Sequence, residues 1–184
     1  MAYEIDYTPS KVCGQFMASN AKMRTLMGPV GSGKSVTSTF ELIRRAGEQE
    51  PNKLGIRKTR CAVVRETARQ LQDTTIKTFL DWFPEGICGR YMRTTKTYFF
   101  KVADIECEVM FRALDDADDV ANLNSLELTF AWFNECRGLR HRPGSVLENL
   151  VRASKGEPVP DRAGLNCPKQ GKDCDICRDG NCHC

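Results

Sequence analysis

Residues 28–35 read Gly28-Pro29-Val30-Gly31-Ser32-Gly33-Lys34-Ser35, which matches the pattern G-x-x-x-x-G-K-[ST] of a phosphate-binding loop. Glycines in such a loop let successive backbone N–H groups turn toward phosphate oxygens, and the helix that follows adds the positive end of its dipole. In this pattern Lys34 reaches the β- and γ-phosphates and the Ser35 hydroxyl ligates Mg²⁺. The sequence therefore predicts a nucleoside-triphosphate site at residues 28–35, with ATP and Mg²⁺ as the expected ligands.

The residues on either side of this loop fit a strand before it and a helix after it, which is the context that the motif requires. Residues 23–27, Met-Arg-Thr-Leu-Met, are able to form a short buried strand. Downstream, apolar or small residues recur at i, i+4, i+7 and i+11, namely Val36, Phe40, Ile43 and Gly47. We expect this stripe to pack on a sheet.

Length and composition favour one globular domain, or a domain with a tail, in a chain of 184 residues. No apolar stretch approaches the ~20 residues that span a bilayer. The amino terminus has neither a basic start nor an apolar core, so we expect a cytoplasmic protein with reduced thiols. The net charge of +3 is too small for a general attraction to polyanions. A basic cluster in the middle of the chain fits either a solvated surface or a track for DNA phosphates: Lys53, Arg57, Lys58, Arg60, Arg65 and Arg69.

Further elements alternate along the chain. Residues 60–65 have the pattern of a second buried strand, and residues 67–83 that of a helix ended by Pro84. Residues 97–102 and 106–111 predict a two-stranded β element that turns at Ala103 and Asp104.

A second signature of nucleotide chemistry is the run Phe130-Ala131-Trp132-Phe133-Asn134-Glu135. It resembles a Walker B strand, in which the first polar residue after the strand holds the hydration shell of Mg²⁺ and the next carboxylate orients or deprotonates the attacking water. Asn134 would hold Mg²⁺ through water with a neutral oxygen instead of the usual Asp. Glu135 is the predicted catalytic residue.

Four ordered strings resemble the large subunit of tailed-phage terminases, the ATP-driven motors that package DNA into procapsids, and the likeness runs from about residue 16 to residue 152. The strings are Met-Gly-Pro-Val-Gly-Ser-Gly-Lys-Ser-Val (27–36), Gly-Ile-Arg-Lys-Thr-Arg-Cys-Ala-Val-Val-Arg-Glu-Thr (55–67), Thr-Thr-Ile-Lys-Thr-Phe-Leu-Asp-Trp-Phe-Pro (74–84) and Asn-Ser-Leu-Glu-Leu-Thr-Phe-Ala-Trp-Phe-Asn-Glu (124–135). The resemblance implies nucleotide and metal roles for Lys34 and Ser35, the catalytic role for Glu135, and a position near Arg65 where nucleotide is coupled to DNA. It also implies double-stranded DNA, a terminase small subunit and the portal or procapsid as partners, assembly of several copies on the portal, and the host bacterial cytoplasm as location.

The chain departs from this family in two ways. Many terminases carry an arginine inside the phosphate loop, where this chain has Pro29 and Val30, so Arg65, Arg112 or a neighbouring subunit would supply that charge. The family also continues into a coupling motif and a metal-dependent nuclease domain, and neither follows residue 152. We therefore predict a partial P-loop ATPase domain at 1–152 and a linker with a cysteine-rich tail at 153–184.

The tail allows two interpretations. Cys174, Cys177, Cys182 and Cys184 provide enough thiolates for one Zn²⁺, but a C-x₂-C pair followed by C-x-C is not the spacing of a zinc ribbon or finger. The alternative is a tail without structure.

The sequence thus predicts an α/β fold of the P-loop NTPase class: a mostly parallel sheet flanked by helices on both faces, with the 97–111 element at one side. The predicted function is ATP binding and hydrolysis in a terminase motor domain that lacks the coupling motif and the nuclease. The alternatives are a catalytically idle remnant that binds nucleotide or DNA, and an unrelated P-loop ATPase of DNA repair or recombination.

Overall fold

The computed structural model describes residues 4–115, 119, 122–123 and 126–135. The chain divides into two units, residues 1–142 and 143–184, and all described residues belong to the first. The predicted cysteine-rich tail, with its candidate zinc ligands, lies outside the described residues.

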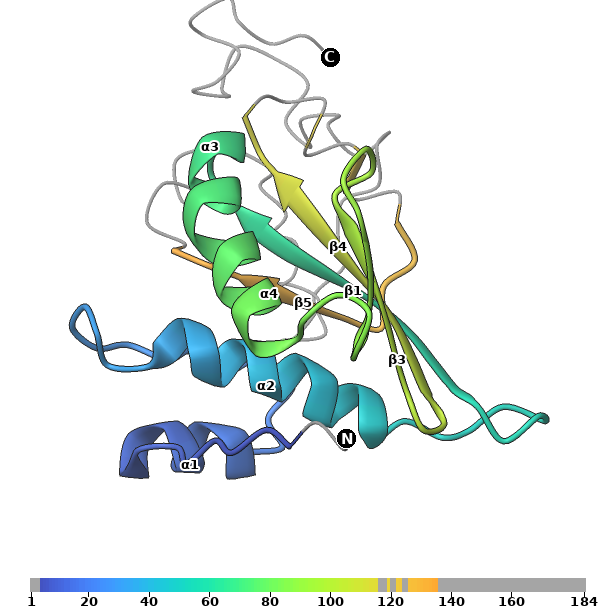
Figure 1. Ribbon diagram of the computed structural model, residues 1–184. Coiled ribbons are helices and arrows are strands. Elements are labelled where there is room, and N and C mark those ends of the chain that lie inside the picture. Colours follow the sequence, from blue (N-terminus) through green and yellow to red (C-terminus); the bar gives the residue numbers. More distant parts are fainter. Residues whose placement is uncertain (1–3, 116–118, 120–121, 124–125, 136–184) are drawn as a thin grey trace, which may run out of the picture. The chain divides into compact units, whose positions relative to one another are not determined.

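A mixed five-stranded sheet forms the centre of this unit, with the strand order β2-β3-β4-β1-β5 (Figure 1). β1 (Arg57–Arg65) lies between β4 (Ile105–Ala113) and β5 (Phe130–Phe133) and is parallel to both. β3 (Thr97–Val102) pairs antiparallel with β4, and β2 (Gly89–Met92) pairs antiparallel with β3. The α/β class is confirmed, but the sheet is parallel only in its β4-β1-β5 half.

The 97–111 element is a β3-β4 hairpin that turns at Ala103, as predicted, but its place in the sheet differs from the prediction. Its second strand is the middle strand of the sheet, paired with β3 on one edge and β1 on the other, and its residues Cys107, Val109 and Phe111 are buried. The hairpin extends the sheet through β2, which the sequence did not predict.

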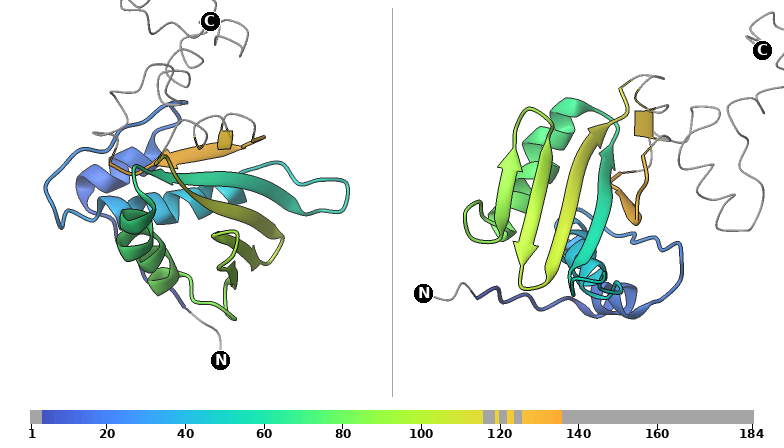
Figure 2. Two further views of the ribbon diagram at one scale, coloured as in Figure 1. Left: turned by 90° about the horizontal axis from the view of Figure 1, so that it is seen from above. Right: turned by 90° about the vertical axis from the view of Figure 1, so that its right-hand side faces the viewer.

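The helices with described bounds cover one face of this sheet (Figure 2). α2 (Lys34–Gly47) packs on it through Leu42 and Ala46, and α1 (Lys11–Ala18) packs on α2. The predicted 67–83 helix is present as a continuous run of α3 (Ala68–Gln70), a π-helical turn η1 (Leu71–Ile76) and α4 (Lys77–Trp82). The start of β1 carries the charged residues Lys58 and Arg60, which line a hollow. Helices that flank the sheet are confirmed on one face, and residues 119, 122 and 123, between β4 and β5, are also helical. Among the described residues no helix is long and apolar enough to cross a membrane.

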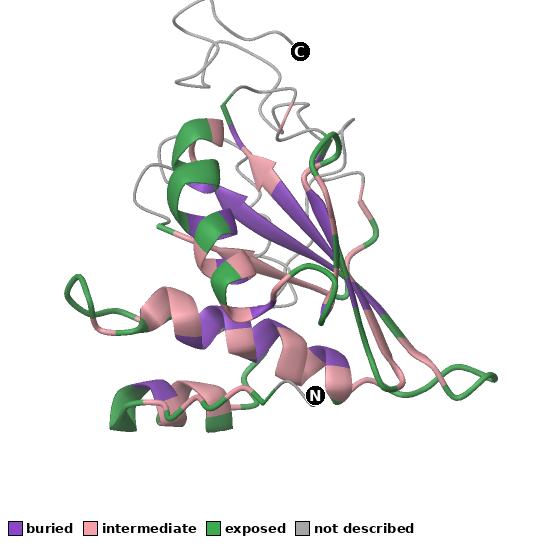
Figure 3. Cartoon of the chain, viewed as in Figure 1, coloured by how far each residue is buried: buried purple, intermediate pink, exposed green. Residues whose placement is uncertain are grey.

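Buried side chains concentrate between the central strands and the helices (Figure 3). The odd-numbered residues of β1, Cys61 and Val63, face this core, because alternate residues of a strand point to one face. Phe79 of α4 is fully buried, and the centroid of its ring lies 5.2 Å from that of the Tyr98 ring and 5.4 Å from that of the Phe111 ring. Aromatic contacts therefore join α4 to the β3-β4 hairpin.

Replacing Phe79 by Leu should lower the free energy of unfolding by about 1–2 kcal/mol, because it removes edge-to-face contacts worth about 0.5–1.5 kcal/mol each. Phe99→Leu is the matched control, since Phe99 is 41% exposed and a surface change costs at most ~0.5 kcal/mol. Urea denaturation of both variants measures the difference. Equal losses would contradict the assignment of Phe79 to the core.

Candidate nucleotide site

The predicted phosphate loop leads directly into α2, whose first residue is Lys34. Gly31 and Gly33 both have φ of +79°, a conformation that side-chain-bearing residues rarely adopt, so glycine is required there for the backbone and not for space. Within the described residues, the amides of Gly31, Gly33, Lys34 and Ser35 donate no hydrogen bond. The loop thus combines unpaired donors with a helix amino terminus, as anion binding requires.

Lys34 folds back over this loop. Its Nζ donates to the carbonyl oxygens of Gly28 at 2.8 Å and Pro29 at 2.6 Å. Ser32 Oγ also donates to the Pro29 carbonyl, at 2.8 Å. The ammonium group therefore lies against the backbone of the predicted phosphate loop. Ser35 lies in the first turn of α2.

The segment before the loop differs from the prediction. Residues 23–27 pair with no strand of the described sheet, and Met23 and Met27 are 40% and 82% exposed. The physical reason is Arg24, whose guanidinium turns to the Glu41 carboxylate on α2 at 2.5 Å. A charged side chain that is held on a helix in this way interrupts the apolar face that a buried strand would need.

The amino-terminal segment contacts the base of the loop, which the sequence did not reveal. Tyr7 stacks on Phe40 with ring centroids 4.3 Å apart, and its hydroxyl lies 2.7 Å from Thr37 Oγ1. Cys13 is buried, with Sγ 3.7 Å from the Ser32 carbonyl oxygen. Hydrogen bonds to Ser10 and Thr37 lower the pKa of the Cys13 thiol, against the effect of its burial.

The strand predicted before Asn134 is present as β5, and Asn134 extends its parallel pairing by donating from its backbone N–H to the Val64 carbonyl at 2.8 Å. Its side-chain Nδ2 donates to Thr75 Oγ1 at 2.9 Å. Glu135 follows with φ of +60°, a conformation that costs a residue other than glycine of order 1–3 kcal/mol and is often found at functional sites.

Glu135 is held by Arg65, the last residue of β1. The two side chains form an ion pair with Nη2 and Oε2 2.6 Å apart, in which Arg65 is 8% exposed and Glu135 65%. Arg65 Nη1 donates to Thr74 Oγ1 at 2.6 Å and to Thr75 Oγ1 at 3.2 Å, whereas its buried Nε has no partner among the described residues. The π-helical turn η1 thus presents consecutive hydroxyls to one guanidinium group.

The predicted site residues form two separate groups. Lys34 and Ser35 belong to the loop, whereas Asn134 and Glu135 form a network with Arg65 and η1. No hydrogen bond or ion pair within residues 4–115 and 126–135 joins the two groups. Figure 1 draws the beginning of α2 and the carboxyl end of β5 on the same side of the molecule.

The basic cluster predicted as a possible phosphate track is mostly neutralised. Its cations pair with carboxylates, as Arg57–Asp104, Lys58–Glu106 at 3.8 Å, Arg60–Glu108 at 2.7 Å, Arg65–Glu135 at 2.6 Å and Arg69–Asp73 at 3.6 Å. This pairing favours the interpretation as a solvated surface. Arg112, the other candidate for the missing loop arginine, donates to the Thr95 carbonyl at 2.9 Å instead of turning to the loop.

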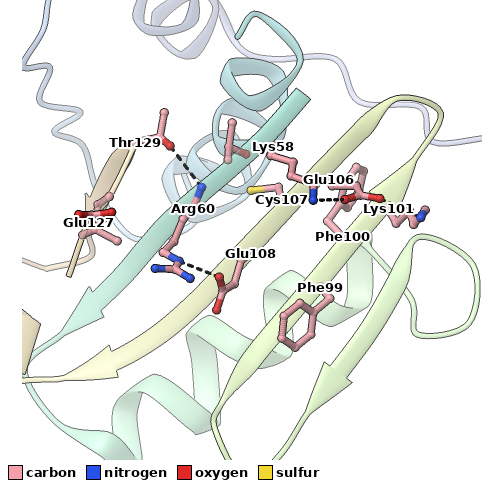
Figure 4. A pocket seen from close by; sticks show the side chains of 12 residues that line it. Lys58, Arg60, Phe99, Phe100, Lys101, Glu106, Cys107, Glu108, Glu127 and Thr129 are labelled. Carbon is pink, nitrogen blue, oxygen red and sulfur yellow. Dashed lines mark hydrogen bonds and ion pairs between the residues drawn. The ribbon is translucent and has the colours of Figure 1, made fainter. Parts of the chain in front are cut away.

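A hollow of about 880 Å³ opens on the face of the sheet away from the helices (Figure 4). It is lined by residues at the start of β1 and β4, including Lys58, Arg60, Glu106 and Glu108. Charged residues of the hollow pair with one another, as Arg60 does with Glu108 and Lys101 with Glu106 at 2.8 Å. Since Arg65 and Asn134 lie at the opposite ends of their strands, this hollow is separate from the predicted site.

No protein-family model matches this chain, and no curated protein matches it. Its fold is similar to that of the large terminase from the thermophilic bacteriophage D6E, with a TM-score of 0.57 and 12% sequence identity. The match covers 82% of this chain and 36% of that protein, so the chain spans about a third of its relative's length. This likeness shows a terminase-like fold.

Proposed function

We propose that this chain binds and hydrolyses Mg²⁺·ATP as the motor domain of a phage DNA-packaging terminase large subunit. The observation that carries the proposal is the loop at residues 28–35, where unpaired amides, Lys34 and Ser35 meet at the start of α2. A terminase-like fold supports the same conclusion at the level of architecture. By the resemblance to terminases we further propose double-stranded DNA as the translocated substrate, a small subunit and portal as partners, and the host bacterial cytoplasm as the place of action.

The residues fit a triphosphate with Mg²⁺. The amides of Gly31, Gly33, Lys34 and Ser35 would donate to phosphate oxygens, and Lys34 would exchange its carbonyl acceptors for the β- and γ-phosphates. Ser35 and Asn134 would hold the metal, Asn134 through water. Bound Mg²⁺ neutralises charge that develops on the phosphates.

Hydrolysis further requires that Glu135 leave Arg65. Its Oε2 accepts from the Arg65 guanidinium at 2.6 Å, and this oxygen has to leave the ion pair before it can accept a hydrogen bond from the attacking water. Once released, Glu135 would orient or deprotonate the attacking water. If Glu135 stays on Arg65, the chain is the idle nucleotide binder that is the alternative.

Phosphate release by the purified chain, with Mg²⁺·ATP and with or without linear double-stranded DNA, separates these functions. The motor proposal expects turnover that DNA changes. Tight ATP binding without phosphate release would favour the idle binder, and turnover stimulated only by single-stranded or broken DNA would favour an ATPase of repair.

Replacing Asn134 by Asp should lower the Mg²⁺ concentration needed for half-maximal activity about fivefold, because a full charge near the metal shell adds about 1 kcal/mol of attraction in a water-like medium. The Thr75 hydroxyl that now accepts from Asn134 is able to rotate and donate to the new carboxylate. A Mg²⁺ titration of ATP turnover measures the shift. An unchanged requirement would place Asn134 away from the metal.

A further inference from the structure

A buried carboxylate on α2, Glu41, binds three guanidinium groups. Its Oε1 accepts from Arg24 Nη1 at 2.5 Å and from Arg45 Nε at 2.7 Å, and its Oε2 accepts from Arg44 Nε at 2.7 Å. Burial of Glu41 opposes ionisation, but the hydrogen bonds from Arg44, Arg24 and Arg45 prevail and lower the pKa of this carboxyl. Glu41 is therefore a fixed anion inside a cationic cluster.

The same arginines attach the preceding part of the chain to α2. We call residues 16–24 the approach segment. Arg24 Nη1 also donates to the carbonyls of Phe16 at 3.1 Å and Ser19 at 3.2 Å, and its guanidinium lies 4.9 Å from the centre of the Phe16 ring. Arg44 donates to the Met17 carbonyl and Arg45 to the Ser19 carbonyl, both at 2.5 Å. The approach segment is thus held to α2 by charge-assisted hydrogen bonds to its backbone.

This arrangement holds both ends of the phosphate loop on one helix. At its carboxyl end the loop is continuous with α2 through Gly33. At its amino end Arg24 is tied to Glu41, on the same helix. Between them residues 25–33 pair with no strand of the described sheet. A loop whose two ends are fixed loses less conformational freedom on binding a ligand than one with a free end.

We propose that Arg24 and Glu41 are positioning residues for the phosphate loop, which hold its amino-terminal end so that the loop is preorganised for a nucleoside triphosphate. The inference rests on the proposed function of residues 28–35. Neither side chain contacts the predicted phosphate site, and both act through the position of the backbone between them.

Arg24→Ala is the variant that tests this role, because Glu41 keeps Arg44 and Arg45 and no buried charge is left without a partner. Its dissociation constant for a fluorescent ATP analogue with Mg²⁺ should rise about tenfold, while turnover at saturating ATP stays that of the parent. Arg24→Lys, which retains a cation for Glu41, should recover part of the affinity. Glu48→Gln is the matched control: Glu48 is 44% exposed and pairs with Arg44 and Arg45 but not with Arg24, so its affinity should be unchanged.

Hydrogen–deuterium exchange over residues 11–27 provides a readout that needs no nucleotide. Arg24→Ala should speed exchange there, and Glu48→Gln should not. Parent-like nucleotide affinity of Arg24→Ala, or parent-like exchange, would overturn the proposal. A parent chain that binds no ATP analogue would instead refute the proposed function. The exchange data would then still test whether Arg24 holds the approach segment on α2.

Discussion

Glu135→Gln is expected to bind Mg²⁺·ATP about as tightly as the parent chain while hydrolysing it ~10²–10⁴-fold more slowly. The amide keeps the volume of the side chain and an oxygen that accepts from Arg65, so the end of β5 should stay in place. It cannot deprotonate or align water as a carboxylate does. Single-turnover phosphate release with saturating ATP measures this loss, and titration of an ATP analogue measures the retained affinity.

Glu127→Gln is the matched control for this experiment. Glu127 is an exposed carboxylate that precedes β5 and lines the hollow, at the opposite end of this strand from Glu135. Its turnover should equal that of the parent. If Glu135→Gln also hydrolyses ATP at the parent rate, β5 and Glu135 have only a structural role, and the motor proposal loses its catalytic residue.

Lys34→Ala should weaken binding of an ATP analogue ~10- to 100-fold, because hydrogen bonds to charged groups contribute about 1.5–3 kcal/mol. The substitution removes the only side-chain cation within the loop sequence at residues 28–35. The fold should persist, since within the described part of the chain Lys34 donates only to loop carbonyls and to Ser32 Oγ. Fluorescence titration gives the affinity, and circular dichroism checks the fold.

Lys53→Ala provides the comparison, since Lys53 is an exposed lysine in the loop before β1. It should bind the analogue as the parent does. If the parent and Lys34→Ala bind the ATP analogue with equal affinity, residues 28–35 do not bind the nucleotide.

The elements that the sequence predicted correctly are those set by local patterns. The apolar run that became β1 and the helical run from Ala68 to Trp82 each bury a face whose period is visible in the sequence. On α2 the predicted stripe of Val36, Phe40, Ile43 and Gly47 is only partly buried, and the buried apolar residues are Leu42 and Ala46 instead. The roles assigned to residues 28–35 and to the residues after β5 also rest on spacing along the chain, and they stay predictions.

The parts that were not predictable depend on contacts between distant residues. Arg65 belonged to a presumed basic cluster, and only the parallel pairing of β1 with β5 brings it to Glu135. The π-helical turn at Leu71–Ile76 has no sequence signal that separates it from an α-helix, yet it places Thr74 and Thr75 on Arg65. Arg24 likewise belongs to a segment that the sequence predicts as a strand, and only the structure shows that it pairs with Glu41.

The central claim is that residues 28–35 bind the phosphates of ATP, and hydrogen–deuterium exchange of the parent chain with and without a Mg²⁺-bound, non-hydrolysable ATP analogue tests it most directly. The account predicts slower exchange across residues 28–36, where loop amides gain phosphate acceptors, and no change at residues 58–60 and 106–108, which line the hollow. Unchanged exchange at 28–36, or protection confined to the hollow, would contradict it.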